Sequence, residues 1–133
     1  MRIGELASAT GFSVHTLRYY EKRGLLKPSI RTESNYRVYS AEDADTLAFI
    51  QRCKDCGFSL EEIEALVSIH QRKADFQCED AKRLTRDKAA DVRAQIVKLN
   101  EILVSLETLE ALCNGGDESA EHCNIIQSLE GKD

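Results

Sequence analysis

The chain has 133 residues, of which 42% are hydrophobic and 31% charged, and its formal net charge at pH 7 is −5. This length allows one domain, or one domain with an extension, and no apolar run approaches the roughly 20 residues that span a membrane. The first residues do not resemble a signal peptide, so we expect a soluble cytoplasmic protein. Because the cytosol keeps thiols reduced, the five cysteines are more consistent with metal ligands or buried residues than with disulfides.

The charge is distributed unevenly along the chain. Residues 1–40 carry seven Lys or Arg against three Asp or Glu, whereas residues 41–133 carry eleven against twenty. A basic block of this kind suits a polyanion partner. Periodic apolar positions in the same block argue against a disordered basic tail.

The first forty residues predict two short helices joined by a tight turn. Apolar residues at helical spacing run through 2–10 and stop at Gly11, after which Ser13 is a suitable N-cap for a second helix. Two helices around such a turn form a helix-turn-helix, whose second helix can recognise DNA. That helix would present a face suited to phosphates and base edges, made of His15, Thr16, Arg18, Tyr19 and Lys22. A helical hairpin with a solvated basic face fits the helix pattern equally well.

Residues 30–39 predict a small hairpin after the two helices. Alternating Tyr36, Val38 and Tyr39 indicate a strand, with residues 32–35 as the turn from a first strand near Ile30. A hairpin in this place would be a wing, from which Arg31 and Arg37 could reach along a DNA backbone. The alternative is an ordinary small sheet with exposed arginines.

Two more helices follow, each with a clear start signal. Ser40 caps the first, which ends before Gly57, and Ser59 with Glu62 forms a capping box that begins the second. The pair Cys53 and Cys56 could be half of a zinc site or a redox pair. Since no second pair lies at zinc-ribbon spacing and no βαβ pattern surrounds it, we predict that both cysteines are structural.

The longest uninterrupted pattern lies between Cys78 and Cys113, a stretch without Pro or Gly that is rich in helix formers. Its apolar residues alternate spacings of three and four, as in a coiled-coil seam: Ala89, Val92, Ile96, Leu99, Leu103 and Leu106. The two cysteines fall in one column, roughly 52 Å apart along a helix, so they cannot share a ligand within one chain. Antiparallel pairing of two copies would bring the Cys78 end of one helix beside the Cys113 end of the other.

The last part of the chain predicts a loop and a short helix. Asn114, Gly115 and Gly116 break the long helix, and nine residues separate Cys113 from Cys123. Apolar residues after Cys123 are spaced for one final short helix.

Three strings together resemble one known family. They are IGELASATGFSVHTLRYYEKRGLL, then Arg-x-x-x-Asn-Tyr-Arg-x-Tyr from Arg31 to Tyr39, then FIQRCKDCGFSLEEI. They resemble the mercury-resistance-regulator (MerR) family of transcription activators, and the resemblance extends over the whole chain. It implies a mostly α fold with a winged helix-turn-helix domain at 1–75, an antiparallel coiled-coil dimerisation helix at 76–112, and a metal-binding loop with a short helix at 113–133. It also adds Asn35 and Tyr36 to the expected DNA contacts.

The resemblance also implies where a metal would bind. In family members that sense divalent ions, a cysteine opens the dimerisation helix and two more bracket the terminal loop, as Cys78, Cys113 and Cys123 do here. Zinc sensors of the family carry a second cysteine where this chain has Asn114, together with a mid-loop histidine that is absent here. The set of three cysteines is most similar to that of the cadmium/lead branch. Three thiolates suit Cd²⁺, Pb²⁺ or Hg²⁺ and tolerate Zn²⁺ with a fourth ligand, and His122 is assigned no role.

The expected function is therefore a metal-responsive regulator that binds promoter DNA as a homodimer and activates metal-resistance genes with RNA polymerase by distorting the DNA. A constitutive DNA-bending protein with incidental cysteines is the main alternative, and a cytosolic metal buffer is another. An enzyme is not expected, because the sequence has no nucleophile elbow, zinc-protease motif or phosphate loop.

Overall fold

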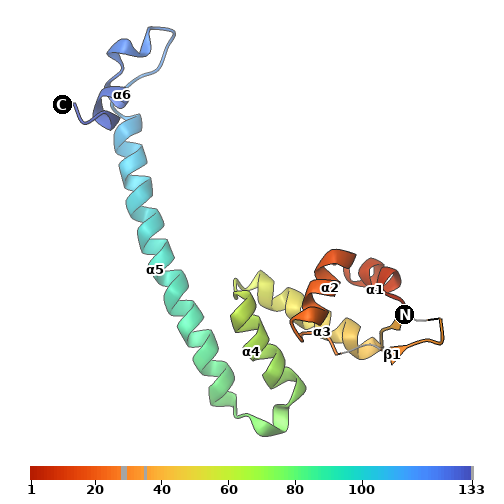
Figure 1. The fold of residues 1–133 in the computed structure, drawn as a ribbon. Coiled ribbons are helices and arrows are strands. Elements are labelled where there is room, and N and C mark those ends of the chain that lie inside the picture. Colours follow the sequence, from red (N-terminus) through yellow and green to blue (C-terminus); the bar gives the residue numbers. More distant parts are fainter. Residues whose placement is uncertain (28–29, 35, 133) are drawn as a thin grey trace. The chain divides into compact units, whose positions relative to one another are not determined.

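The computed structural model describes residues 1–27, 30–34 and 36–132 (Figure 1). Its elements are α1 (Ile3–Thr10), α2 (Val14–Lys22), β1 (Ile30–Arg31), β2 (Arg37–Val38), α3 (Ala41–Asp55), α4 (Leu60–Gln71), η1 (Lys73–Asp75), α5 (Cys78–Glu110), η2 (Ala120–His122) and α6 (Asn124–Leu129). The predicted mostly α fold is confirmed. No helix in these described ranges is long and apolar enough to cross a membrane.

The chain divides into two compact units, Met1–Lys88 and Ala89–Asp133. The division falls inside α5, because Leu84 near the start of that helix packs against the core of the first unit. The functional division expected from the sequence, at residues 75 and 112, is a different partition and remains a prediction.

Helices α1 and α2 form the predicted helix-turn-helix. Gly11 closes α1 with a positive φ of 81°, and its N–H donates to the carbonyl of Ala7. The Ser13 side chain accepts a hydrogen bond from the Thr16 N–H at 3.1 Å, which confirms Ser13 as the N-cap of α2. Leu6 and Leu17 are fully buried and hold the two helices in one core.

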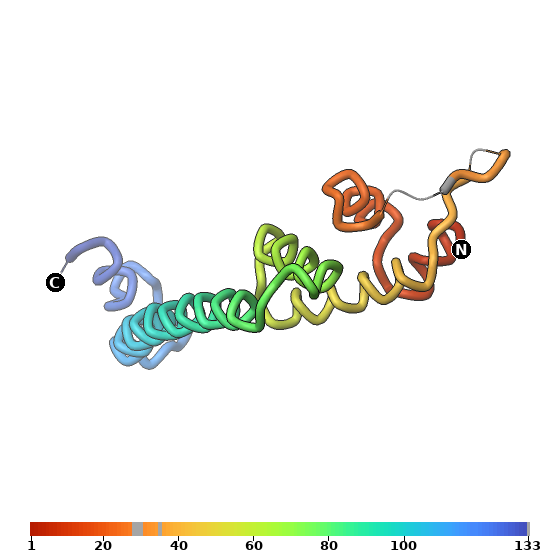
Figure 2. Tube along the Cα trace, turned by 90° about the horizontal axis from the view of Figure 1, so that it is seen from below, coloured from red at the N-terminus to blue at the C-terminus, as the bar shows by residue number. Residues whose placement is uncertain are grey.

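Strands β1 and β2 form the predicted wing, an antiparallel pair with Ile30 opposite Val38 and Arg31 opposite Arg37. Figure 2 shows this hairpin projecting beyond the helices of the first unit. After β2, the N–H of Tyr39 donates to the carbonyl of Met1 at 2.6 Å. Asn35, expected in the turn and at the DNA, lies outside the described residues.

Helices α3 and α4 complete the core of the first unit. Both predicted caps are confirmed, with Ser40 beginning α3 and Ser59 beginning α4. Cys53 is buried beside Leu47 and Ile50, as predicted for a structural cysteine. Cys56, by contrast, is exposed at the C-cap position of α3.

Glu62 joins the start of α4 to α5. Its Oε1 accepts hydrogen bonds from the Ser59 N–H at 2.7 Å and from Lys88 Nζ at 2.8 Å. The hydrogen bond from Lys88, followed by those from Ser59, lowers the pKa of Glu62 to about 2. Because these partners bind the ionised carboxylate, protonation of Glu62 weakens the contact between α4 and the first turns of α5.

Replacing this carboxylate should change how stability depends on acid. A group whose pKa is depressed in the folded state contributes stability above its unfolded pKa of about 4.5, and that contribution is lost as the pH falls towards about 2. We therefore expect Glu62→Gln to flatten the slope of the free energy of unfolding against pH between about 4.5 and 2. Urea denaturation at several pH values measures this slope. Glu61→Gln, which removes an exposed neighbouring carboxylate, should leave the slope unchanged, and equal slopes for the wild type and Glu62→Gln would contradict the expectation.

In the second unit, the predicted seam residues of α5 lie at the surface of the single chain. Leu99 is 62% exposed, Leu103 52% and Leu106 56%. Figures 1 and 2 both show α5 as one unbroken helix. A long helix that leaves a regular apolar stripe in solvent requires a partner surface.

Candidate nucleic-acid interface and metal centre

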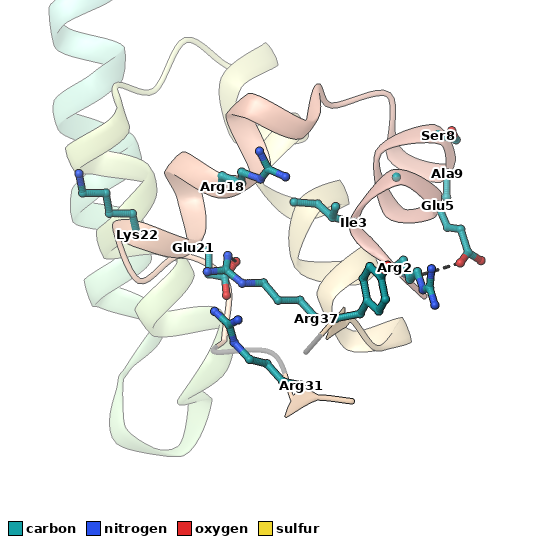
Figure 3. Close-up of a pocket in the computed structure, with 12 residues that line it drawn as sticks. Arg2, Ile3, Glu5, Ser8, Ala9, Arg18, Glu21, Lys22, Arg31 and Arg37 are labelled. Atoms are coloured by element: carbon teal, nitrogen blue, oxygen red, sulfur yellow. Dashed lines mark hydrogen bonds and ion pairs between the residues drawn. The ribbon is translucent and has the colours of Figure 1, made fainter. Parts of the chain in front are cut away.

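A large open groove lies where α1, α2 and the wing meet (Figure 3). Helix α2 contributes Arg18 and Lys22, and the wing contributes Arg31, Tyr36 and Arg37. The structure therefore brings together five residues that the sequence predicted as DNA contacts. A groove with several cations and one exposed aromatic ring suits the phosphates and sugars of a nucleic acid.

Three other predicted contacts do not line this groove. His15 is exposed, Thr16 binds Ser13 at the start of α2 through the two hydroxyls at 2.8 Å, and Tyr19 accepts a hydrogen bond from Arg23 at 3.3 Å. Arg23 also binds Glu64 of α4 at 2.9 Å, so Tyr19 lies on the side of α2 that faces α4. The helical period groups these residues with Arg18, but the packing of α2 decides which of them face the wing.

Arg2 lines the same groove and was not predicted from the sequence. Its guanidinium carbon lies 4.0 Å above the ring of Tyr36, a cation–π contact between the start of α1 and the wing. The sequence shows only that a basic residue directly precedes the first helix. It does not show that the wing folds back to this residue.

An acidic residue, Glu21, also lines the groove. Its Oε2 accepts hydrogen bonds from Arg37 Nη1 at 2.6 Å and from the Tyr39 hydroxyl at 2.8 Å. A hydrogen bond between the side chains of Arg37 and Tyr39, together with the negative charge of Glu21, raises the pKa of Arg37 above its ordinary value. In Figure 3, the side chains of Arg37 and Arg31 both extend from the wing towards the end of α2.

The second unit brings two of the three predicted metal ligands together. Backbone N–H groups of Ile126 and Ile125 and, to a smaller extent, the side chain of Cys113 lower the pKa of the Cys123 thiol. The N–H of Gly115 lies 3.3 Å from the sulfur of Cys113. The loop between the cysteines is closed by a hydrogen bond from the Asn124 side chain to the Leu112 carbonyl at 3.2 Å. A lowered thiol pKa favours the thiolate, which is the form that binds a soft cation.

The third predicted ligand, Cys78, belongs to the first unit and opens α5, where it is exposed. Within the described part of a single chain, no group of three or more His, Cys, Asp or Glu side chains could hold a metal ion. One chain therefore supplies a pair of thiols near the end of α5 and a single thiol at its beginning.

Comparison with known proteins identifies the family. Residues 1–70 match the family model described as MerR HTH family regulatory protein, and residues 44–109 match the model described as MerR, DNA binding. The chain belongs to the MerR family of transcriptional regulators. The predicted resemblance is thereby confirmed, and the transcription regulators to which the chain is similar are not enzymes.

Individual relatives cover nearly the whole chain. The HTH-type transcriptional regulator ZntR of Escherichia coli K12 is 36% identical over 97% of this chain and 92% of its own length. The mercuric resistance operon regulatory protein of Bacillus cereus is 38% identical over 96% of each chain. The transcription regulator PbrR691 from Ralstonia metallidurans CH34, solved in complex with lead(II), is 32% identical with a TM-score of 0.86 over 97% of this chain and 98% of its own.

Proposed function

We propose that the protein is a metal-responsive transcriptional regulator that binds promoter DNA as a homodimer. The observation that carries the proposal is the pair of neighbouring thiols, Cys113 and Cys123, in a chain that also exposes the apolar stripe of α5. A second copy of the chain can pack against this stripe, and antiparallel pairing would place Cys78 of the partner subunit beside the two thiols. Each metal site would then have three cysteine ligands drawn from two chains.

The chemistry of the donors limits the choice of metal. Three thiolates form a soft site that suits Cd²⁺, Pb²⁺ and Hg²⁺, whereas Zn²⁺ needs a fourth ligand to complete a tetrahedron. Names of similar proteins span several metals, including mercury and lead(II), so the family supports a metal effector and leaves the ion open. On the donor set alone, we propose cadmium or lead as the effector.

The proposed DNA mechanism is a change of shape in a complex that stays assembled. A metal ion bound by Cys78 of one chain and by the loop thiols of the other would change the orientation of the two winged units on the DNA. The family resemblance implies a promoter whose two polymerase elements are spaced too far apart, and each surplus base pair turns one element by about 35° relative to the other. A bent and untwisted site would bring the two elements back into the alignment that RNA polymerase needs. Deforming the DNA site costs on the order of 1–6 kcal/mol. Protein–DNA contacts that differ between the metal-free and the metal-bound protein must supply this free energy.

A transcription assay with purified protein and RNA polymerase tests this function. On a promoter duplex selected by the protein, we expect activation by Cd²⁺ or Pb²⁺ at lower free concentrations than by Zn²⁺, and little response to Cu(I). The reason is that three thiolates hold large soft divalent ions without a further ligand. A stronger response to Cu(I) than to every divalent ion would reject the proposed site.

The same assay separates the regulator from a constitutive DNA-bending protein. Such a protein would distort its site equally with and without metal, and removing the thiols would change nothing. Cys113→Ser together with Cys123→Ser should abolish activation while DNA binding persists. Cys56→Ser, which removes an exposed thiol in the first unit, is the matched control and should respond to metal as the wild type does.

A further inference from the structure

Glu21 is an unexpected residue to find in a groove suited to a polyanion. A carboxylate there repels phosphate, so a groove selected for charge alone would not contain it. Yet its side chain is only 13% exposed and one oxygen accepts two short hydrogen bonds. The contacts of this carboxylate therefore indicate that Glu21 has a structural role within the protein.

The two hydrogen bonds reach different parts of the first unit. Tyr39 is buried, 2% exposed, and its backbone is bound to Met1, so its hydroxyl is a fixed point of the core. Arg37 lies on β2 of the wing, opposite Arg31. A single oxygen of Glu21 thus connects the last turn of α2 to the core and to the wing at once.

The wing needs such a connection. Its two strands have two residues each, and an isolated two-stranded hairpin is marginally stable in water. Hydrogen bonds that involve a charged group are shorter and stronger than neutral ones. Glu21 is therefore well placed to fix the angle between the wing and α2.

We propose that Glu21 is a positioning residue of the DNA interface, which orients the wing through Arg37 and thereby commits the Arg37 guanidinium to this ion pair instead of to a phosphate. This inference rests on the proposed DNA-binding function and assigns roles within the same groove. It separates Arg37 from Arg18, which is exposed on α2 and remains a candidate for direct contact with the DNA.

The test measures DNA affinity as a function of salt for Glu21→Ala and Glu21→Gln, without metal. The probe is a duplex selected by the wild-type protein from a random-sequence library. A positioning role predicts that Glu21→Ala weakens binding at least tenfold while the slope of log Kd against log salt stays unchanged. Glu21→Gln, which keeps an acceptor oxygen, should recover most of the affinity. If Glu21 merely repelled phosphate, both variants would bind more tightly, and that result would overturn the proposal.

Arg37→Ala provides the second arm. A phosphate contact contributes close to one unit to the salt slope. We expect Arg18→Ala to lower the slope by about one unit and Arg37→Ala to leave it unchanged. The double variant Glu21→Ala with Arg37→Ala should bind no more weakly than Glu21→Ala alone, because Glu21→Ala already removes the connection to Arg37. A reduced slope for Arg37→Ala, or additive losses in the double variant, would also overturn the proposal.

Two controls complete the design. Glu33→Ala removes one exposed negative charge from the wing turn and should leave the affinity unchanged or raise it slightly. Thermal melting of each variant shows whether it is folded, and Glu21→Gln serves as the informative variant if Glu21→Ala is not. If the wild-type protein selects no duplex at all, the proposed DNA-binding function fails and the inference fails with it. Selection by the wild type together with unaltered Glu21 variants defeats the inference alone.

Discussion

Mixed dimers with complementary cysteine substitutions are expected to bind one metal ion tightly, against two for the wild-type dimer. One chain carries Cys78→Ser and the other carries Cys113→Ser with Cys123→Ser. If each site combines Cys78 of one chain with the two loop thiols of the other, the mixed dimer holds one complete site and one site without any thiol. Titration with Cd²⁺, followed by the ultraviolet absorption of the thiolate–metal bonds, counts the tight sites.

The homodimers of the two variants make the result interpretable. Cys113 and Cys123 lie together in the single chain, so the Cys78→Ser homodimer keeps two thiolates at each site and should bind weakly. The other homodimer keeps only one thiol at each site and should bind least. Sites built within one chain would both stay broken in the mixed dimer, and the absence of a tight site there would reject the antiparallel arrangement.

Leu99→Glu is expected to raise the dissociation constant of the dimer at least 100-fold. Each dimer would lose the burial of two leucine side chains, at about 1.5–3 kcal/mol each, and about 1.4 kcal/mol corresponds to a factor of ten. Leu99 is 62% exposed in the single chain, so the substitution should leave the chain itself folded. Analytical ultracentrifugation measures the dimer, and a DNA titration should show a parallel loss, because a monomer can hold only one half-site.

Val97→Glu is the matched control for this experiment. Val97 lies on the same helix and is 57% exposed, but two residues correspond to about 200° around the axis, so it faces away from Leu99. We expect this variant to remain a dimer. Dissociation of both variants to the same extent would mean that the stripe of α5 is not the dimer interface.

Local sequence patterns were enough to predict the structural features that depend on near neighbours in the chain. Ser13, Ser40 and Ser59 were predicted as helix starts because an N-cap acts on the N–H groups two or three residues later. The seam of α5 was predicted because residues three and four apart share one face of a helix. The strings around α2 and the wing indicated the family and, with it, the expected chemistry of Cys78, Cys113 and Cys123.

Contacts between residues far apart in the sequence follow from the folding of the whole first unit, and helical or strand periodicity does not predict them. Glu21 and Arg37 are both typical surface residues in the sequence, and only the return of the wing to the end of α2 joins them. The same folding places Arg2 over Tyr36, and it turns Tyr19 towards Arg23 and away from the groove. Helical periodicity gives the face on which a residue lies, but the neighbour that covers this face depends on packing over long stretches of chain. For this reason the sequence predicted the cations of the groove but not the carboxylate that holds one of them.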